Sequence, residues 1–266
     1  MNLLGQNSDV PARYAPEILF PIPRVEARQR LGLSEPMPFH GEDLWHGWEL
    51  SWLNESGQPQ SGVGRFLFPA DTENLVESKS FKLYLNSLNN ERYANVTALL
   101  KVLTTDLSAV AGGGVSVEVL SPDDESLMPS ALPGVCIDAE KRSVSADTPS
   151  PDLLEVERAQ GETMGVYSHS LRSLCPVTAQ PDWATVLVSS VGARVSPGSL
   201  LAYLHAFREH QEYHEQCVER MFRDLQAAGL ESFSVQALYT RRGGMDINPW
   251  RSTSAGQSPR LRSLRQ

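Results

Sequence analysis

Cysteine is scarce in this sequence of 266 residues, which excludes a disulfide-stabilised fold. The three cysteines are Cys136, Cys175 and Cys217, an odd number and too few for a disulfide framework. They also lack the paired spacing that is typical of a structural zinc site. We therefore expect a reducing, cytoplasmic setting for this chain.

Other features are missing as well. No run of about 18 apolar residues exists, so no membrane span is predicted. The first nine residues lack the basic start and apolar block of a signal peptide, which again favours the cytoplasm. The net charge of −9 argues against loose binding to nucleic acid phosphates. No phosphate-loop motif and no Gly-x-Gly-x-x-Gly turn is present, which argues against a Rossmann-type nucleotide site.

What is present indicates a globular α+β protein, with 41% hydrophobic and 21% charged residues. The same order of elements is predicted twice, as strand, strand, helix, helix, strand. In the first half these are residues 45–53, 64–68, 79–90, 92–106 and 115–120. In the second half they are 165–173, 183–190, a helix from 197, a helix ending near 229, and a final strand 233–239. Such tandem units imply antiparallel sheets with paired helices on one face.

A polar stretch rich in Pro, Ser and Asp separates the halves. It predicts a first module over 1–125, a connection over 126–160 and a second module over 161–266. Residues 241–266 hold six arginines against one acid. We interpret residues 252–266 as a frayed basic tail.

Cys175 and Asp182 stand seven positions apart in a segment framed by Pro176 and Pro181. A thiolate is a strong nucleophile, and a nearby carboxyl group can donate or accept a proton. The two prolines favour a shaped loop. Alternatively, Cys175 is a small buried hydrophobic residue.

Residues 76–84 place Glu77, Ser78, Lys79 and Lys82 where a strand gives way to a helix. A helix N-terminus attracts anions, and the two lysines lie on one face, so this segment is a candidate phosphate site. The alternative is a capped, solvated helix start.

His214 and Glu215 open the last long helix. Glu215 is a candidate for accepting two parallel N–H bonds from the edge of a guanine-like base, as is Glu77 in the first half. Alternatively, His214 and Glu215 form an exposed capping pair. After the last predicted strand, Arg241 to Gly244 form either a phosphate clamp or a plain turn with surface arginines.

Together these segments resemble the QueF family of NADPH-dependent nitrile reductases, in its long, two-module form. The matching motifs are Leu19 to Arg24, Glu77 to Tyr84, Ser173 to Thr178 with Asp182, His214 to Cys217, and Tyr239 to Gly244. They occur in the right order over nearly the whole chain. One departure is Ala179, where the family pattern has glycine, and it concerns loop geometry.

The resemblance implies two tunnel-fold modules in each chain, a homodimer, and no catalytic metal. It implies reduction of 7-cyano-7-deazaguanine to 7-aminomethyl-7-deazaguanine with two NADPH, in queuosine biosynthesis. It makes Cys175 the nucleophile of a covalent thioimide and Asp182 the proton donor. The implied substrate-binding residues are Val76, Glu77, Ser78, His214 and Glu215, and the implied cofactor-binding residues are Ser78, Lys79, Arg242 and Gly243.

Two other functions fit parts of the sequence. One is a thiol hydrolase or amidotransferase that uses Cys175 with His214 and Asp182. It leaves the lysine and arginine clusters unexplained. The other is a non-catalytic tunnel-fold protein that binds a purine or pterin, with Cys175 merely packed.

Overall fold

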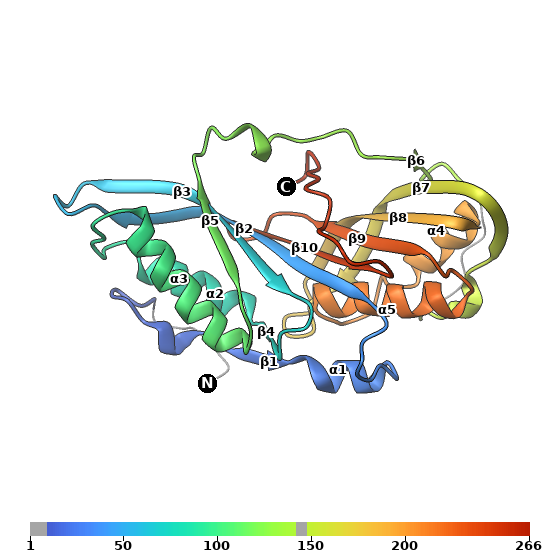
Figure 1. The fold of residues 1–266 in the computed structure, drawn as a ribbon, viewed down its shortest axis with the longest axis horizontal. Helices are drawn as coiled ribbons and strands as arrows, with labels where there is room; N and C mark the ends of the chain where they lie inside the picture. The colour runs from blue at the N-terminus through green and yellow to red at the C-terminus, as the bar shows by residue number, and fades with distance from the viewer. Residues whose placement is uncertain (1–9, 142–147) are drawn as a thin grey trace. The chain divides into compact units, whose positions relative to one another are not determined.

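The computed structural model describes residues 10–141 and 148–266 (Figure 1). Contacts divide the described chain into two compact units. The first takes residues 10–27, 43–128 and 241–246, and the second takes 28–42, 129–141, 148–240 and 247–266. The units interleave along the chain, and the module boundaries after residues 125 and 160 stay a prediction. Within the described ranges, no helix is both long and apolar enough to cross a membrane.

The first unit is an antiparallel sheet with two helices against it. Its sheet has the strand order β5-β3-β2, and a separate antiparallel pair joins β1 to β4. The elements are η1 (Pro16–Ile18), β1 (Pro21–Pro23), β2 (His40–Leu53, from Asp43 in this unit), β3 (Pro59–Pro69), β4 (Asn74–Val76), α2 (Ser78–Ser87), α3 (Val96–Ala111), β5 (Ser116–Leu120) and η2 (Glu125–Leu127). The chain passes from the first unit to the second within the short helix α1 (Arg24–Arg30).

Aromatic packing joins α2 to the strands. Phe81 is completely buried and contacts Trp45 on β2 and Phe66 on β3, with ring centroids 5.5 and 4.9 Å apart. Helix α3 begins later than predicted, because Asn95 caps it by accepting a 3.0 Å bond from the Ala98 N–H. It also ends later than the predicted residue 106, at Ala111, because Gly112 follows with a φ of 68°, the left-handed conformation that favours glycine.

The second unit repeats this layout. Its strand order is β10-β9-β8-β7-β6. Strand β6 is parallel to β7, whereas the β7–β8, β8–β9 and β9–β10 pairs are antiparallel. The elements are β6 (Val135–Cys136), η3 (Pro151–Leu153), β7 (Val156–Leu174), β8 (Pro181–Val195), α4 (Pro197–His205), α5 (His214–Ala227), β9 (Phe233–Tyr239) and β10 (Met245–Ser252, from Ile247 in this unit). The expected α+β class, with a helix pair for each set of strands, is confirmed (Figure 1).

The same hydrogen bond joins the helix pair in each unit. Tyr84 on α2 donates to Asp106 on α3 over 2.6 Å, and Tyr203 on α4 donates to Asp224 on α5 over 2.7 Å. Burial, together with the neighbouring carboxylate, raises the pKa of both tyrosine hydroxyls well above the ordinary value. Both hydroxyls therefore stay protonated as donors. This shared contact supports the interpretation of the chain as a tandem repeat.

Two expectations about the C-terminus are wrong. Phe233–Tyr239 is not the final strand, because β10 follows it and every residue of β10 is buried. Residues 252–266 are not frayed either. Ser258 donates its backbone N–H and its hydroxyl to Glu42 over 2.9 and 2.5 Å, and Arg260 pairs with the same carboxylate at 2.8 Å. The basic composition of this segment serves internal ion pairs as well as the surface.

Candidate active site

The hairpin between β7 and β8 brings Cys175 and Asp182 together. Ser173 pairs with Asp182 and Leu174 with Pro181, and the Cys175 N–H donates to the Gln180 carbonyl over 2.9 Å. Alternate residues of a strand face the same side, and Cys175 directly follows β7, so we expect it on the face of Ser173 and Asp182. Such diagonal neighbours have Cα atoms about 7–8 Å apart, within reach of a shared small ligand. The predicted loop is therefore shorter than expected, since Asp182 already belongs to β8.

Ala179 lies in the turn of this hairpin with a φ of 54°. Among the described residues it is the one non-glycine residue with positive φ. Its N–H donates to the Cys175 carbonyl over 3.0 Å, so the unusual backbone closes the turn beside the thiol. At this position the resemblance leads us to expect glycine, and the positive φ shows why glycine suits it.

His214, at the start of α5, contacts the predicted proton donor. Its Nε2 lies 3.4 Å from Oδ2 of Asp182, and Asp182 is 4% exposed. The imidazole ring lies over the Tyr239 ring, with centroids 3.9 Å apart and an interplanar angle of 30°. Tyr239, at the end of β9, is a member of this cluster that sequence reasoning did not assign, although it opens one of the matching motifs.

Tyr239 is one of three buried residues with polar side chains at this site, with Cys217 and Ser173. Cys217 and Tyr239 are 0% and 1% exposed, and Ser173 is 0% exposed. Burial raises the pKa of the Cys217 thiol well above its ordinary value, and the charge of Glu212 adds to the effect. Burial likewise raises the pKa of the Tyr239 hydroxyl, with further contributions from Cys217 and Asp182. Cys217 is therefore an inert, protonated thiol, whereas Cys175 is partly exposed.

The interpretation of His214 and Glu215 as an exposed capping pair is wrong. Glu215 is 3% exposed. The capping role belongs to Gln216, whose side-chain oxygen accepts the Tyr213 N–H over 3.3 Å. Glu215 is therefore a buried carboxylate in the first turn of α5, next in sequence to the histidine that contacts Asp182.

In the first unit, the helix start is capped as the alternative interpretation expected, but its cap is buried instead of solvated. Both carboxylate oxygens of Glu77 accept backbone N–H groups of α2, from Lys79 over 2.8 Å and from Ser80 over 2.7 Å. Glu77 is 2% exposed, and Val76, the last residue of β4, is also buried. Ser78 and Lys79 form the first turn of α2. The helix terminus holds the carboxylate rigidly, which suits a recognition group as well as a cap.

The segment from Arg242 to Met245 is a tight hairpin turn. Arg242 and Met245 exchange backbone hydrogen bonds of 2.8 and 3.2 Å. Gly243 and Gly244 between them have φ of 58° and 76°, the conformation of a type I′ turn. A Cβ atom on Gly243 would lie 3.4 Å from the Lys82 amine. The segment therefore has the geometry of a plain turn, as the second interpretation expected. The turn also brings the backbone close to Lys82.

This turn borders a cavity of about 200 Å³ within the first unit. The lining residues are Gly47, Glu49, Lys82, Leu85, Asn86, Asn89, Gly243, Gly244 and Met245. The predicted cofactor residues Ser78, Lys79, Arg242 and Gly243 all belong to this unit. Cys175, Asp182, His214 and Glu215 all belong to the second unit.

Comparison with known proteins identifies the family. Residues 10–119 match the family model described as nitrile reductase, 7-cyano-7-deazaguanine-reductase N-term, and residues 181–258 match the model described as QueF-like protein. A protein named NADPH-dependent 7-cyano-7-deazaguanine reductase from Chromohalobacter salexigens is 48% identical over 267 aligned positions, which cover 99% of this chain and 96% of that protein. A protein of the same name from Teredinibacter turnerae is 46% identical, over 98% of this chain and 95% of its own length.

The chain belongs to the QueF family of nitrile reductases. Each half of the chain contains one of the two ranges that match a family model. Cys175 lies between the two matched ranges, whereas Asp182, His214 and Glu215 lie inside the second. The similarity to the QueF relatives covers nearly the whole chain, so it also includes the hairpin that carries Cys175.

Proposed function

We propose that this QueF-family protein reduces 7-cyano-7-deazaguanine to 7-aminomethyl-7-deazaguanine with NADPH, through a covalent thioimide on Cys175, in queuosine biosynthesis. One observation supports the assignment of residues most directly. The antiparallel register of β7 and β8 presents Cys175 and Asp182 on the same face of the hairpin, and His214 contacts Asp182 there.

The chemistry needs a nucleophile and a proton donor on one side of the substrate. The Cys175 thiolate attacks the nitrile carbon and forms a C–S bond, while Asp182 delivers a proton to the nitrile nitrogen. NADPH supplies a hydride to each of the two reduction steps. After the first reduction, the C–S bond breaks and the Cys175 thiolate leaves. The second reduction, with one more proton, yields the amine.

His214 acts on Asp182 in this scheme. The 3.4 Å contact restrains the carboxyl group and provides a path by which a new proton reaches it after each transfer. Tyr239 packs against the face of the imidazole ring. Both residues are well placed to keep the donor aligned while the substrate remains attached.

We assign base binding to Val76, Glu77, Ser78, His214 and Glu215. The edge of a 7-deazaguanine carries adjacent N–H donors, and a carboxylate accepts two of them in parallel. Glu77 and Glu215 suit this role because each is buried at a helix N-terminus. The imine formed after the first reduction hydrolyses in water, so the site must exclude water while the base is bound.

We place the NADPH phosphates at the first unit. Lys82 and the Gly243–Gly244 turn line the same cavity, and a turn without side chains lets backbone N–H groups approach a phosphate. We assign NADPH binding to Ser78, Lys79, Arg242 and Gly243, of which Gly243 lines this cavity. The proposal also includes a homodimer and no catalytic metal, since thiol addition and hydride transfer need no Lewis acid.

Incubation with the nitrile base, with and without NADPH, tests this function. A reductase forms a thioimide absorbance without NADPH and consumes two NADPH per amine when NADPH is present. Ammonia release without NADPH consumption would instead support the thiol hydrolase. Binding of the base with neither signal would support the non-catalytic binder.

A further inference from the structure

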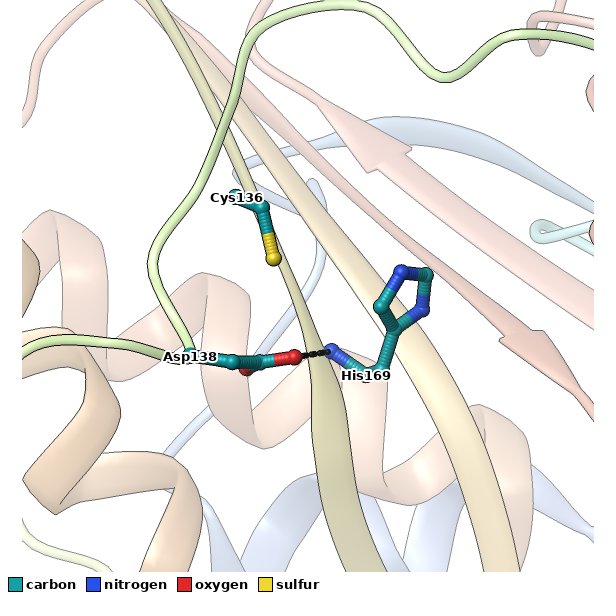
Figure 2. A group of neighbouring side chains, drawn as sticks. All are labelled: Cys136, Asp138 and His169. Carbon is teal, nitrogen blue, oxygen red and sulfur yellow. Dashed lines mark hydrogen bonds between the residues drawn. The ribbon is translucent and has the colours of Figure 1, made fainter.

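Three metal-ligating side chains meet on the surface of the second unit, at the edge of its sheet. Cys136, Asp138 and His169 each offer one ligand atom, and these atoms all lie within 4.8 Å of one another (Figure 2). None of the three belongs to the site described above. From this cluster we propose that the protein binds a divalent transition-metal ion of the zinc class.

The backbone brings these residues together without help from a metal. Strand β6 runs parallel to β7 with Cys136 opposite Tyr167, and the Ile137 N–H donates to the Tyr167 carbonyl over 3.0 Å. The next residues in this register are Asp138 and His169. Since Cys136 and Asp138 are two positions apart on extended backbone, their side chains point to the same side.

Hydrogen bonds hold the carboxylate of Asp138 in place. One oxygen accepts the Ser168 hydroxyl over 2.5 Å, and the other accepts the His169 N–H over 3.0 Å, the bond drawn in Figure 2. A carboxylate oxygen has two lone pairs, so each keeps one for a metal. Ser168 is 1% exposed, which makes the support behind the exposed ligand rigid.

The imidazole of His169 is oriented in a similar way. Its Nδ1 lies 2.9 Å from the hydroxyl of Thr185, a completely buried residue. Arg265, which has no acceptor, donates to the same hydroxyl over 3.0 Å and to the His169 carbonyl over 3.0 Å. In the tautomer with the proton on Nδ1, the hydroxyl accepts that proton and the Nε2 lone pair stays available for a metal. Metal-bound histidines are commonly oriented by such a bond on the other nitrogen.

The donor set selects the metal. A thiolate, an imidazole and a carboxylate suit Zn²⁺, whereas Mg²⁺ and Ca²⁺ prefer oxygen ligands alone. Tetrahedral zinc places its ligand atoms roughly 3.5 Å apart, given metal–ligand bonds of about 2.0–2.3 Å. Small rotations of three exposed side chains achieve this closure, and a water completes the shell. The ion then fastens the two-residue strand β6 to β7.

Cobalt titration of the full-length protein, freed of metal by chelation, tests the proposal. With Co²⁺ as the probe, we expect one equivalent to bind, with visible bands of tetrahedral cobalt and a thiolate-to-cobalt charge-transfer band. Zn²⁺ should bleach both. Cys136→Ser should abolish the charge-transfer band, and His169→Gln and Asp138→Asn should weaken binding about tenfold or more. Ser168→Ala, which leaves all three ligands in place, should weaken it about tenfold.

Cys175→Ala is the matched control, because it removes the other thiol that is not fully buried. It should keep the cobalt spectrum. Cys136→Ser should keep the circular dichroism spectrum and the reductase activity of the metal-free wild type. A loss of metal binding without a loss of activity would separate this proposal from the reductase function. Absence of the charge-transfer band in the wild type would overturn the proposal, as would its persistence in Cys136→Ser or its loss in Cys175→Ala.

Discussion

The Nε2 atom of His214 lies 3.4 Å from Oδ2 of Asp182 and joins the first turn of α5 to strand β8. These residues are 32 positions apart in sequence, and the contact connects a predicted base-binding residue to the predicted proton donor. If Asp182 is the proton donor that we propose, substitutions at either residue should affect proton delivery. The orientation of the donor is a property of the second unit alone.

Replacement of the nucleophile should separate binding from chemistry. We expect Cys175→Ala to abolish the thioimide absorbance and all turnover, while the affinity for the nitrile base, measured by calorimetry, stays within about threefold of the wild type. Cys136→Ser is the control and should form the adduct normally. Turnover by Cys175→Ala at the wild-type rate would rule out the thiol mechanism.

Removal of the acid should slow the first step. Asp182→Asn keeps the size of the side chain and a polar contact with His214, but the amide is not an acid. We expect adduct formation to slow by about 10²–10⁴-fold with the melting temperature little changed, because general acid catalysis contributes about that much. Stopped-flow absorbance measures the rate. An unchanged rate would remove Asp182 from proton transfer.

Recognition of the base should depend on the charge of Glu215. In Glu215→Gln, an amide N–H faces the N–H groups of the ligand, and a charge-assisted hydrogen bond worth about 1.5–3 kcal/mol is lost. We expect base affinity to fall about tenfold to a hundredfold in calorimetry. Glu231→Gln, a change at an exposed glutamate of the same unit, is the control. Equal affinities for the two variants would contradict the assignment.

The turn beside the thiol should be stabilised by glycine. Ala179 adopts a φ of 54°, which costs an L-residue roughly 1–2 kcal/mol, partly offset by the flexibility that glycine adds to the unfolded chain. We expect Ala179→Gly to raise the free energy of unfolding by about 0.5–1 kcal/mol, measured by denaturant titration. Ala131→Gly, at an exposed alanine without positive φ, should lower it or leave it unchanged.

The contribution of Glu212, which precedes α5, to the stability of the fold should be lost in acid. Burial opposes ionisation of Glu212, but hydrogen bonds from Arg220 and His210 outweigh it and lower its pKa to about 2. Because the folded pKa lies below the unfolded one, this stabilisation is complete above about pH 4.5 and is lost as the pH falls toward 2. We expect Glu212→Gln to cost about 2–3 kcal/mol of unfolding free energy at pH 7.

The same variant gives the pH profile that checks the cause. The difference between Glu212→Gln and the wild type should shrink between pH 4.5 and 2, the interval between the two pKa values. Glu209→Gln is the control, since Glu209 also pairs with an arginine but its side chain is 76% exposed. It should change stability by less than about 1 kcal/mol at any pH. A difference that is independent of pH would contradict the electrostatic explanation.

Local patterns in the sequence determined much of this protein. The apolar spacing predicted the helix pairs, because this signal acts through residues within a turn or two of one another. The ordered motifs also identified the family, and with it the roles expected of Cys175 and Asp182. Even the departure at Ala179 was visible in advance, although its positive φ was not.

The tertiary structure decided what depends on distant residues. Strand β10 and the packed tail escaped prediction because their polar residues are satisfied by partners far along the chain, as Ser258 is by Glu42. The contact of His214 with Asp182, and the meeting of Cys136 with His169, depend on strand register and on where a helix docks. Register is set by many weak contacts acting together, and no short stretch of sequence carries that sum.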